Sequence, residues 1–403
     1  MMKRFNTLLL IAAMVIGFAA CGDKDADNKT ATEKLEELSM NTEWINYATA
    51  AASELLDDCI KLWAAWNGSN DVSETDLARI GGSSFFSQPG IGVNGYAAIL
   101  KSAGESGNTF ESQNDAIETI LIDGFANISN EVGAAKIGEP NGFAREGETE
   151  SAVYAVESWY SWNSITDYSD NIISIKNGYC GRRGTINTSA NDNSISALVK
   201  RINANLDTEV NAAIDNAYNS IQGMTAPFRN NLTGSKVDAA MDACADLTEI
   251  IEGRLRAAVI DTTAAERDYT EILKVYTDEV VVPTYKDLKE KAWTLYNAVD
   301  ALRQDPTNQS KLDAACNAWR AARVPWEQSE AILFGPASDD MLGLDPSMDS
   351  WPLSQEDIAG ILQNTNLKTV EQFIGAISSE DVRGFHTLEL LLFKDGKNRT
   401  VRE

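Results

Sequence analysis

The sequence predicts an all-α protein made of two helical bundles. Apolar residues recur at spacings of three and four along most of the 403-residue chain, which is the period of a helix with one buried face. Sustained alternation of apolar and polar residues, the pattern of a half-buried strand, is absent from the sequence. Glycine and proline cluster at a few places between the helical stretches, and the length fits one very large domain or two domains of ordinary size.

The helices predicted in the first part of the chain depend on this spacing. The clearest covers residues 195–221, where Leu198, Ile202 and Leu206 continue one apolar stripe. The others cover Trp44–Trp66, Ile117–Val132, Val153–Tyr160 and Met241–Val259. Two stretches rich in glycine and proline, residues 81–107 and 138–148, are predicted to be loops.

The second part of the chain continues the pattern. Helices are predicted over Tyr269–Val280, Tyr285–Leu302, Leu312–Arg323 and Val382–Phe393. Prolines punctuate residues 324–353, which predicts an ordered connector with short helical turns. We place the domain boundary near residue 262, so that residues 43–262 form one helical domain and residues 263–403 the other.

The N-terminus has the features of an export signal. Two basic residues precede an apolar stretch from Thr7 to Phe18, and small residues lead to Cys21. The stretch is shorter than the ~20 residues that span a bilayer, and it resembles a bacterial lipoprotein signal over residues 1–20. That resemblance implies that Cys21 carries lipid, that residues 21–42 are a charged tether, and that the protein is anchored in the bacterial cell envelope, facing the periplasm or exposed on the outer membrane.

Charge and cysteine spacing exclude several classes of function. The net charge of −26 repels phosphate backbones, so nucleic acid is not an expected partner. The cysteines after Cys21 form no C-x-x-C pair, which gives no support to a zinc ribbon or a thioredoxin-type site. We favour buried thiols over a disulfide, although an exported protein permits both. These cysteines are Cys59, Cys180, Cys244 and Cys316.

The single histidine of the chain, His386, lies in a G-x-H-x-x-E run that ends at Glu389. On a helix, residues three apart share a face with their Cβ atoms about 5–6 Å apart, so the imidazole and the carboxylate can meet one cation or one proton. A zinc protease motif with two histidines one turn apart is excluded. The alternative is a histidine that only packs or caps, and for Glu330 and Glu327 the alternative is a solvated surface carboxylate.

Three segments together resemble the imelysin family of bacterial exported proteins, which is linked to iron uptake and described as peptidase-like. They are Ala322–Pro336 with the sequence ARVPWEQSEAILFGP, then DSWPL at residues 349–353, and GFHTLE at residues 384–389 followed by LLLF. A weaker match covers ESWYSWNS at residues 157–164 and residues beyond it, including Asp167.

The order of these segments differs from the order that is typical of the family. The half with P-W-x-x-S-E and G-x-H-x-x-E normally comes first, but here it occupies residues 263–403 and the other half occupies residues 43–262. The chain therefore resembles a circular permutation of the family, which is sterically reasonable when the original termini lie close together.

The resemblance implies a metal site that His386, Glu389 and Glu330 form in a cleft between the two domains. One nitrogen and several carboxylate oxygens suit iron, which is the expected metal, and also zinc, manganese or copper. A neutral imidazole is needed, so we expect affinity to fall on the order of pH 6–7 for an unperturbed histidine. Further candidates for the functional site are Gly384, Ser329, Trp326, Arg323, Glu157, Ser158, Ser161 and Asp167.

Three functions remain open from the sequence. We rank first a lipid-anchored protein of iron acquisition that binds a metal or metal chelate without cleaving peptides, with iron-transport components as further candidate partners. A metallopeptidase of the imelysin type is second, because one histidine with carboxylates can hold zinc with an open water position. A metal-independent interaction module is third.

Overall fold

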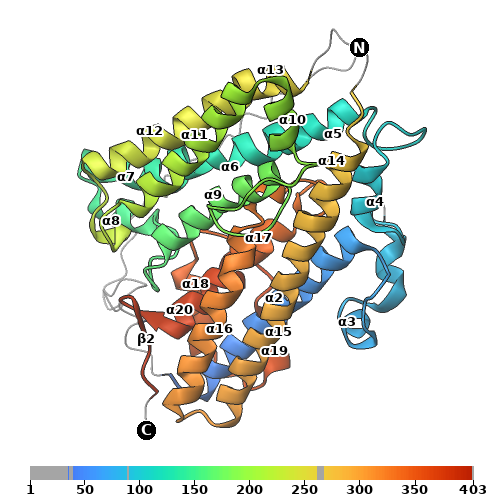
Figure 1. Cartoon of the computed structure of the whole chain (residues 1–403). Coiled ribbons are helices and arrows are strands. Elements are labelled where there is room, and N and C mark those ends of the chain that lie inside the picture. The colour runs from blue at the N-terminus through green and yellow to red at the C-terminus, as the bar shows by residue number, and fades with distance from the viewer. Residues whose placement is uncertain (1–34, 36–39, 89, 261–266, 402–403) are drawn as a thin grey trace, which may run out of the picture.

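The computed structural model describes residues 35, 40–88, 90–260 and 267–401, and Figure 1 shows helices throughout these residues. The predicted all-α class is confirmed: within the described residues the strands are limited to one hairpin, in which Phe393 pairs with Asn398 and Lys394 with Lys397. Its strands are β1 (Phe393–Lys394) and β2 (Lys397–Asn398). The predicted signal peptide, Cys21 and most of the predicted tether lie outside the described residues.

One group of helices contains most of the C-terminal part of the chain together with the first long helix. Helix α15 packs against both α16 and α2, and α2 also contacts α19 and α20. The lower part of Figure 1 shows this group. Its α-helices are α2 (Thr42–Asn67), α15 (Val282–Gln304), α16 (Gln309–Glu327), α17 (Leu344–Asp349), α18 (Gln355–Gln363), α19 (Val370–Ala376) and α20 (Gly384–Leu392). Short 3-10 turns connect them: η7 (Glu330–Ile332), η8 (Gly335–Ala337) and η9 (Glu380–Val382).

A second group fills the upper part of Figure 1, where α11 packs against α12 and α9. Two continuous helical runs of this group, residues 113–146 and 235–259, contain π-helical turns. Its elements are α5 (Gln113–Thr119), η2 (Ile120–Ala126), α6 (Asn127–Asn130), η3 (Glu131–Ile137), α7 (Gly138–Glu146), α8 (Thr149–Tyr154), α9 (Ser164–Cys180), α10 (Ile195–Ile202), α11 (Ala204–Gln222), η4 (Phe228–Asn230), α12 (Ser235–Ile250), η5 (Ile251–Leu255) and α13 (Arg256–Val259). The remaining elements are α3 (Glu74–Arg79), η1 (Gly82–Ser87), α4 (Gly95–Lys101), α14 (Thr270–Val275) and η6 (Tyr276–Val281).

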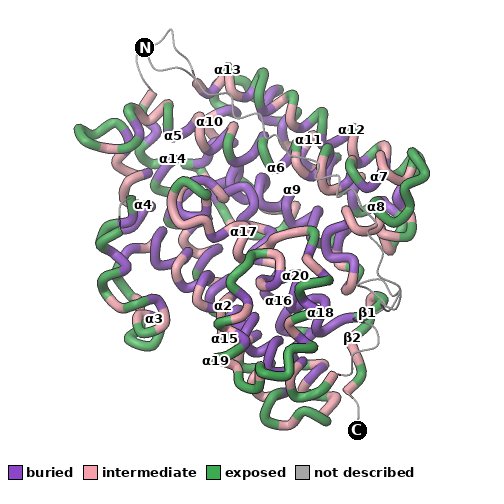
Figure 2. Tube along the Cα trace, turned by 180° about the vertical axis from the view of Figure 1, so that it is seen from behind, coloured by how far each residue is buried: buried purple, intermediate pink, exposed green. Residues whose placement is uncertain are grey.

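Helix α9 joins the two groups, since it contacts α11 on one side and α16 on the other. It is buried along almost its whole length, as Figure 2 shows. The predicted division assigns residues 43–67 to the first domain, but α2 packs with the helices of the second. The boundary near residue 262 itself falls among residues 261–266, outside the described part. The circular permutation stays a prediction.

Several predicted elements differ from the structure for local reasons. The predicted helix 195–221 is broken at Asn203, whose extended backbone and side-chain oxygen cap α11 at the amides of Asn205 and Leu206. The predicted loop 138–148 is mostly helix α7, which continues directly from the π-helical segment η3, and Pro140 lies just after that irregular turn. The predicted loop 81–107 contains the short helices η1 and α4.

The connector over residues 324–353 has the short helical turns that the sequence predicts, η7, η8 and α17. All four cysteines after Cys21 are buried and free, as favoured from the sequence. Among the described helices, none combines the length and the apolar character that crossing a membrane requires.

Candidate functional site

The G-x-H-x-x-E run forms the start of α20, and Gly384 fixes where that helix begins. Gly384 has φ +81°, and a Cβ at this position would lie 2.4 Å from the carbonyl oxygen of Met348. Only glycine tolerates both the left-handed backbone and this approach. The contact holds the N-terminus of α20 against α17, so that His386 on α20 faces Asp349 at the end of α17.

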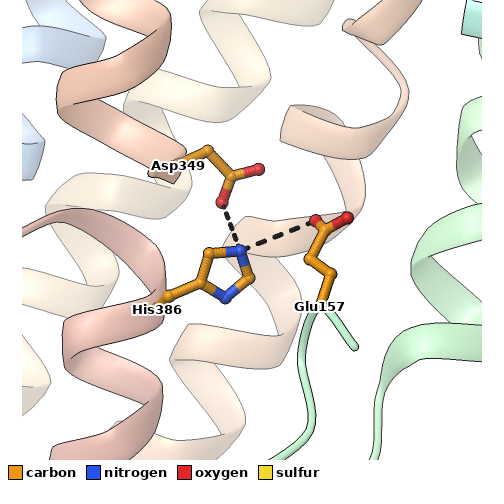
Figure 3. Close-up of side chains that lie close together, drawn as sticks. All are labelled: Glu157, Asp349 and His386. Carbon is orange, nitrogen blue, oxygen red and sulfur yellow. Dashed lines mark ion pairs between the residues drawn. The ribbon is translucent and has the colours of Figure 1, made fainter. Parts of the chain in front are cut away.

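His386 is completely buried, and its two ring nitrogens face different carboxylates. Nε2 lies 3.1 Å from Oδ1 of Asp349 and 3.6 Å from Oε1 of Glu157, as Figure 3 shows. Nδ1 lies 3.2 Å from Oε2 of Glu389. Neither contact of Nε2 has hydrogen-bond geometry, although both distances are those of ion pairs with a protonated imidazole. Buried polar atoms are rarely left without a partner, and this nitrogen is satisfied either by a proton that pairs it with the two carboxylates or by a metal ion between the three groups.

Glu389 orients the imidazole. Its Oε2 contacts Nδ1 of His386, and its Oε1 accepts hydrogen bonds of 2.7 Å from both the backbone N–H and the hydroxyl of Ser161. Because a carboxylate only accepts, a neutral His386 hydrogen-bonded to it carries its proton on Nδ1. That tautomer leaves the lone pair of Nε2 toward Asp349 and Glu157, which is the arrangement of carboxylate–histidine–metal sites.

Arg323 lies at the centre of the carboxylates and is completely buried. Its guanidinium contacts Oδ1 of Asp349 and, at 2.8 Å, Oε1 of Glu157, the same two oxygens that face Nε2 of His386. It also pairs with Glu327 and, at 3.3 Å, with Asp167. The rigid planar fork of an arginine therefore holds the two carboxylates in place opposite the histidine.

Trp326 and Ser329 position the connector. The indole N–H of Trp326 donates to Oδ2 of Asp349 at 2.6 Å, which fixes the second oxygen of that carboxylate. The hydroxyl of Ser329 donates to the carbonyl of Trp326 at 2.7 Å and closes the turn after α16. Both side chains thus act through Asp349 and the backbone rather than on the space beside His386.

Residues 157–163 form a constrained loop before α9, where the sequence predicts the helix Val153–Tyr160. Helix α8 ends at Tyr154, and Ser158 has φ +54°, a conformation that costs a serine about 1–3 kcal/mol. The hydroxyl of Ser158 donates to Asp167 at 2.5 Å, and that of Ser164 donates to the carbonyl of Glu157 at 2.6 Å. These contacts turn the Glu157 side chain into the cluster.

Glu330 is buried but lies in a neighbouring group of carboxylates. Oxygens of Glu327, Glu330 and Asp349 lie within 4.8 Å of one another, and His386 is not part of that group. Lys136 on η3 lies 3.9 Å from Oε2 of Glu330 and 3.0 Å from Oε2 of Glu157. The interpretation of Glu327 as a solvated surface carboxylate is wrong, since its side chain is completely buried.

The pKa values separate the carboxylates into two sets. Burial would raise the pKa of Glu157, but Lys136, His386 and Arg323 hold it well below its usual range. Burial would likewise raise the pKa of Asp349, but Arg323 and His386 lower it. These two carboxylates are therefore ionised, as metal ligands must be.

Burial dominates the second set. It raises the pKa of Glu327 and of Glu330 well above the usual range, and that of Asp167 to about 6 despite Arg323. Burial would lower the pKa of Lys136, but the surrounding carboxylates, Glu157 first among them, hold it well above its usual value, so Lys136 is a cation.

The pKa of His386 responds to the same charges. Burial would lower it, but Asp349, Glu157 and Glu389 raise it well above the usual value. The proton that a metal must displace is therefore held more tightly than in the unperturbed histidine that the sequence analysis assumed.

A metal ion fits one part of this cluster. Ligand atoms of His386, Glu157 and Asp349 lie within 4.8 Å of one another, and the nitrogen among them lacks a hydrogen-bond partner. One imidazole with two carboxylates suits iron, zinc, manganese or copper. The cluster is enclosed rather than open to solvent: His386 and Glu389 are fully buried, and Glu330 is 5% exposed.

The geometry supports a serine nucleophile less well than it supports a metal ion. The Ser161 hydroxyl donates to Glu389 and the Ser158 hydroxyl donates to Asp167. A Ser–His catalyst requires the hydroxyl to bond to the imidazole that accepts its proton. The hydroxyls of Ser158 and Ser161 therefore hold the carboxylates of Asp167 and Glu389 in place.

The sequence pointed to much of this cluster and missed two of its members. His386, Glu389, Arg323, Glu157, Ser161 and Asp167 were candidates and lie together. Asp349 was not chosen as a candidate, although it begins the DSWPL segment. Lys136 lies in no motif of the sequence that would have singled it out. Both reach the cluster through tertiary packing.

Comparisons with known proteins give the following similarities. The sequence model of the family described as Imelysin, Peptidase M75, matches residues 22–253 and 281–403. The structure is similar to a crystal structure of an imelysin peptidase from Bacteroides ovatus, with 38% sequence identity, a TM-score of 0.76, and coverage of 91% of this chain and 100% of that chain. A stretch of 124 residues is 39% identical to iron-regulated protein A of Synechococcus elongatus; it spans 30% of this chain and 31% of that relative.

Proposed function

Because this chain belongs to the imelysin family, we propose that it is an iron-related protein of the bacterial cell envelope whose buried cluster binds one metal ion through His386, Glu157 and Asp349. The observation that carries this proposal is Nε2 of His386, a buried nitrogen without a hydrogen-bond partner that faces two ionised carboxylates. Glu389 holds the other nitrogen in the tautomer that metal binding requires.

The relatives support iron as the metal. The Synechococcus elongatus protein with the matching 124-residue stretch is named an iron-regulated protein. One nitrogen and two carboxylate oxygens also suit iron chemically, although they admit zinc and copper. When bound, the ion would provide a positive centre for an oxygen-rich ligand such as a chelate, and Glu389 and Arg323 would hold the protein ligands in position.

Calorimetry on protein purified without a chelator or a polyhistidine tag tests the proposal. We expect one iron per wild-type chain at pH 7.5, and a loss of affinity of roughly 100-fold or more in His386→Ala and Asp349→Asn, because loss of a ligand should cost at least as much as loss of a group that orients one. Asp207→Asn is the matched control, because Asp207 is a buried aspartate that accepts hydrogen bonds from Tyr179 and Ser196 on the α9–α11 side. Equal affinity in all four proteins would refute the site.

A metallopeptidase is the second candidate. The similar structure from Bacteroides ovatus is described as an imelysin peptidase, and three protein ligands would leave positions for a metal-bound water. Peptide cleavage by the metal-loaded protein that His386→Ala abolishes would favour this function. Binding without cleavage favours iron acquisition. If the protein binds no metal at all, the metal-independent interaction module is the function that remains.

The lipid anchor and the partners complete the proposal. The sequence before Cys21 supports export and lipidation in the cell envelope, and the acidic charge supports attraction of cations rather than nucleic acids. Components of iron transport are the partners that this location and this metal suggest.

A further inference from the structure

Lys136 contacts the proposed metal site from the side opposite His386. Oε1 of Glu157 faces Nε2 of His386, and Oε2 of the same carboxylate lies 3.0 Å from the ammonium of Lys136. The ammonium is also 3.9 Å from Oε2 of Glu330 and 3.9 Å from Oε1 of Glu131. Its side chain is only 10% exposed, so solvent screens its charge little.

This position makes Lys136 a permanent positive charge beside any ion that Glu157 binds. Repulsion between the ammonium and the ion grows in proportion to the charge of the ion, so it opposes a trivalent ion one and a half times as strongly as a divalent one. The carboxylates attract the ion, and this attraction favours the trivalent ion over the divalent one. Lys136 therefore offsets part of the preference for trivalent ions that a carboxylate-rich site would otherwise have.

Lys136 can do this without blocking Glu157. A lysine ammonium is a compact charge on a flexible stem, in contrast to the planar fork of Arg323. Glu131 lies on the same helical segment as Lys136, and its side chain is 40% exposed, at the edge of the cluster. The ammonium can thus move toward Glu131 and Glu330 when a metal draws on Glu157.

We propose that Lys136 is a built-in cation that shifts this site toward divalent metal ions and away from trivalent ones, a proposal that rests on the metal binding proposed above. For iron, this shift favours the ferrous form over the ferric form.

The test compares Zn²⁺ and Ga³⁺, two redox-inert probes, in chelator-buffered competition with the wild type and with Lys136→Met. Removing the positive charge should increase the affinity for Zn²⁺ by about tenfold and that for Ga³⁺ by about thirtyfold, because the logarithm of each gain scales with the charge of the ion. Lys136→Arg keeps the charge and should keep the wild-type ratio of the two affinities.

Lys176→Met is the matched control. Lys176 is a buried lysine on α9 that contacts Asn211 and Asp215, so its removal should change neither affinity. Circular dichroism checks folding, and Lys136→Gln, which keeps a polar amide beside Glu157, replaces Lys136→Met if the latter loses its helical signal. Equal gains for the two ions, or a loss for both, would overturn the role of Lys136 while leaving metal binding intact. Absence of binding by the wild type would instead overturn the proposed function.

Discussion

The substitution Glu389→Gln isolates the orienting role of Glu389, because it keeps the size of the side chain and removes its charge. Oε1 of Glu389 accepts two hydrogen bonds from Ser161, each 2.7 Å long, so a glutamine must turn its amide oxygen toward Ser161. Its NH₂ group then faces Nδ1 of His386, which lies 3.2 Å from Oε2 in the wild type. Because this NH₂ group can only donate, Nδ1 must accept a hydrogen bond from it and cannot carry a proton.

The proton of a neutral His386 in the variant therefore moves to Nε2, the nitrogen that faces Asp349 and Glu157. Nε2 then has no lone pair for a metal, and its N–H faces Asp349. Loss of such an orienting carboxylate lowers metal affinity by about 10–100-fold, which corresponds to about 1.4–2.7 kcal/mol. The variant should nevertheless fold, because the substitution keeps the size of the side chain and the two hydrogen bonds from Ser161.

Calorimetry with ferrous iron at pH 7.5 measures this loss, with Asp207→Asn as the control for a buried carboxylate outside the cluster. Unchanged affinity in Glu389→Gln would refute the tautomer argument. A complete loss of binding, far beyond 100-fold, would instead indicate that Glu389 is itself a metal ligand, as the sequence analysis expected.

Three further predictions concern stability, pH and the membrane. Gly384→Ala should lower the free energy of unfolding by about 2–4 kcal/mol, from left-handed strain and a clash with the backbone of Met348, and a urea titration that shows no loss would contradict the close approach. Burial lowers the pKa of His386, but Asp349, Glu157 and Glu389 raise it well above 6.5. The stability that the imidazolium gives the metal-free protein is therefore complete below pH 6.5, and it is lost as the pH rises through the pKa of His386 in the folded protein. Metal affinity should rise over the same range, since the metal displaces this proton, and calorimetry that shows a plateau already reached at pH 7 would contradict it. Cys21→Ser should abolish incorporation of radiolabelled fatty acid, and unchanged labelling would rule out the lipid anchor.

Local patterns in the sequence were sufficient for the fold class. Spacings of three and four report one buried face of a helix, and they identified most of the helices. The same spacing misled at Asn203, because the apolar stripe continues from Ile202 to Leu206 while the Asn203 side chain caps a new helix. It misled again at Val153–Tyr160, where the backbone of Ser158 turns out of the helix to bring Glu157 into the cluster.

The candidate site divides in the same way. His386 and Glu389 could be paired from sequence because they are neighbours on one helix. Asp349 and Lys136 reach the cluster from α17 and η3 through tertiary packing, which no local pattern encodes. Glu330 lies in the neighbouring group of carboxylates, because which carboxylate faces Nε2 depends on packing at the level of a few ångströms. Sequence reasoning could therefore find the histidine and its orienting partner, but not the complete set of ligands.

The central claim is that the metal binds Nε2 of the single histidine. Because His386 is the only histidine in the chain, tag-free protein labelled with ¹⁵N-histidine gives one pair of imidazole resonances that needs no assignment by mutagenesis. Addition of a diamagnetic ion such as Zn²⁺ should shift the Nε2 resonance strongly and leave Nδ1 protonated beside Glu389. Stoichiometric metal binding that leaves Nε2 unchanged, or that removes the proton from Nδ1, would contradict the account.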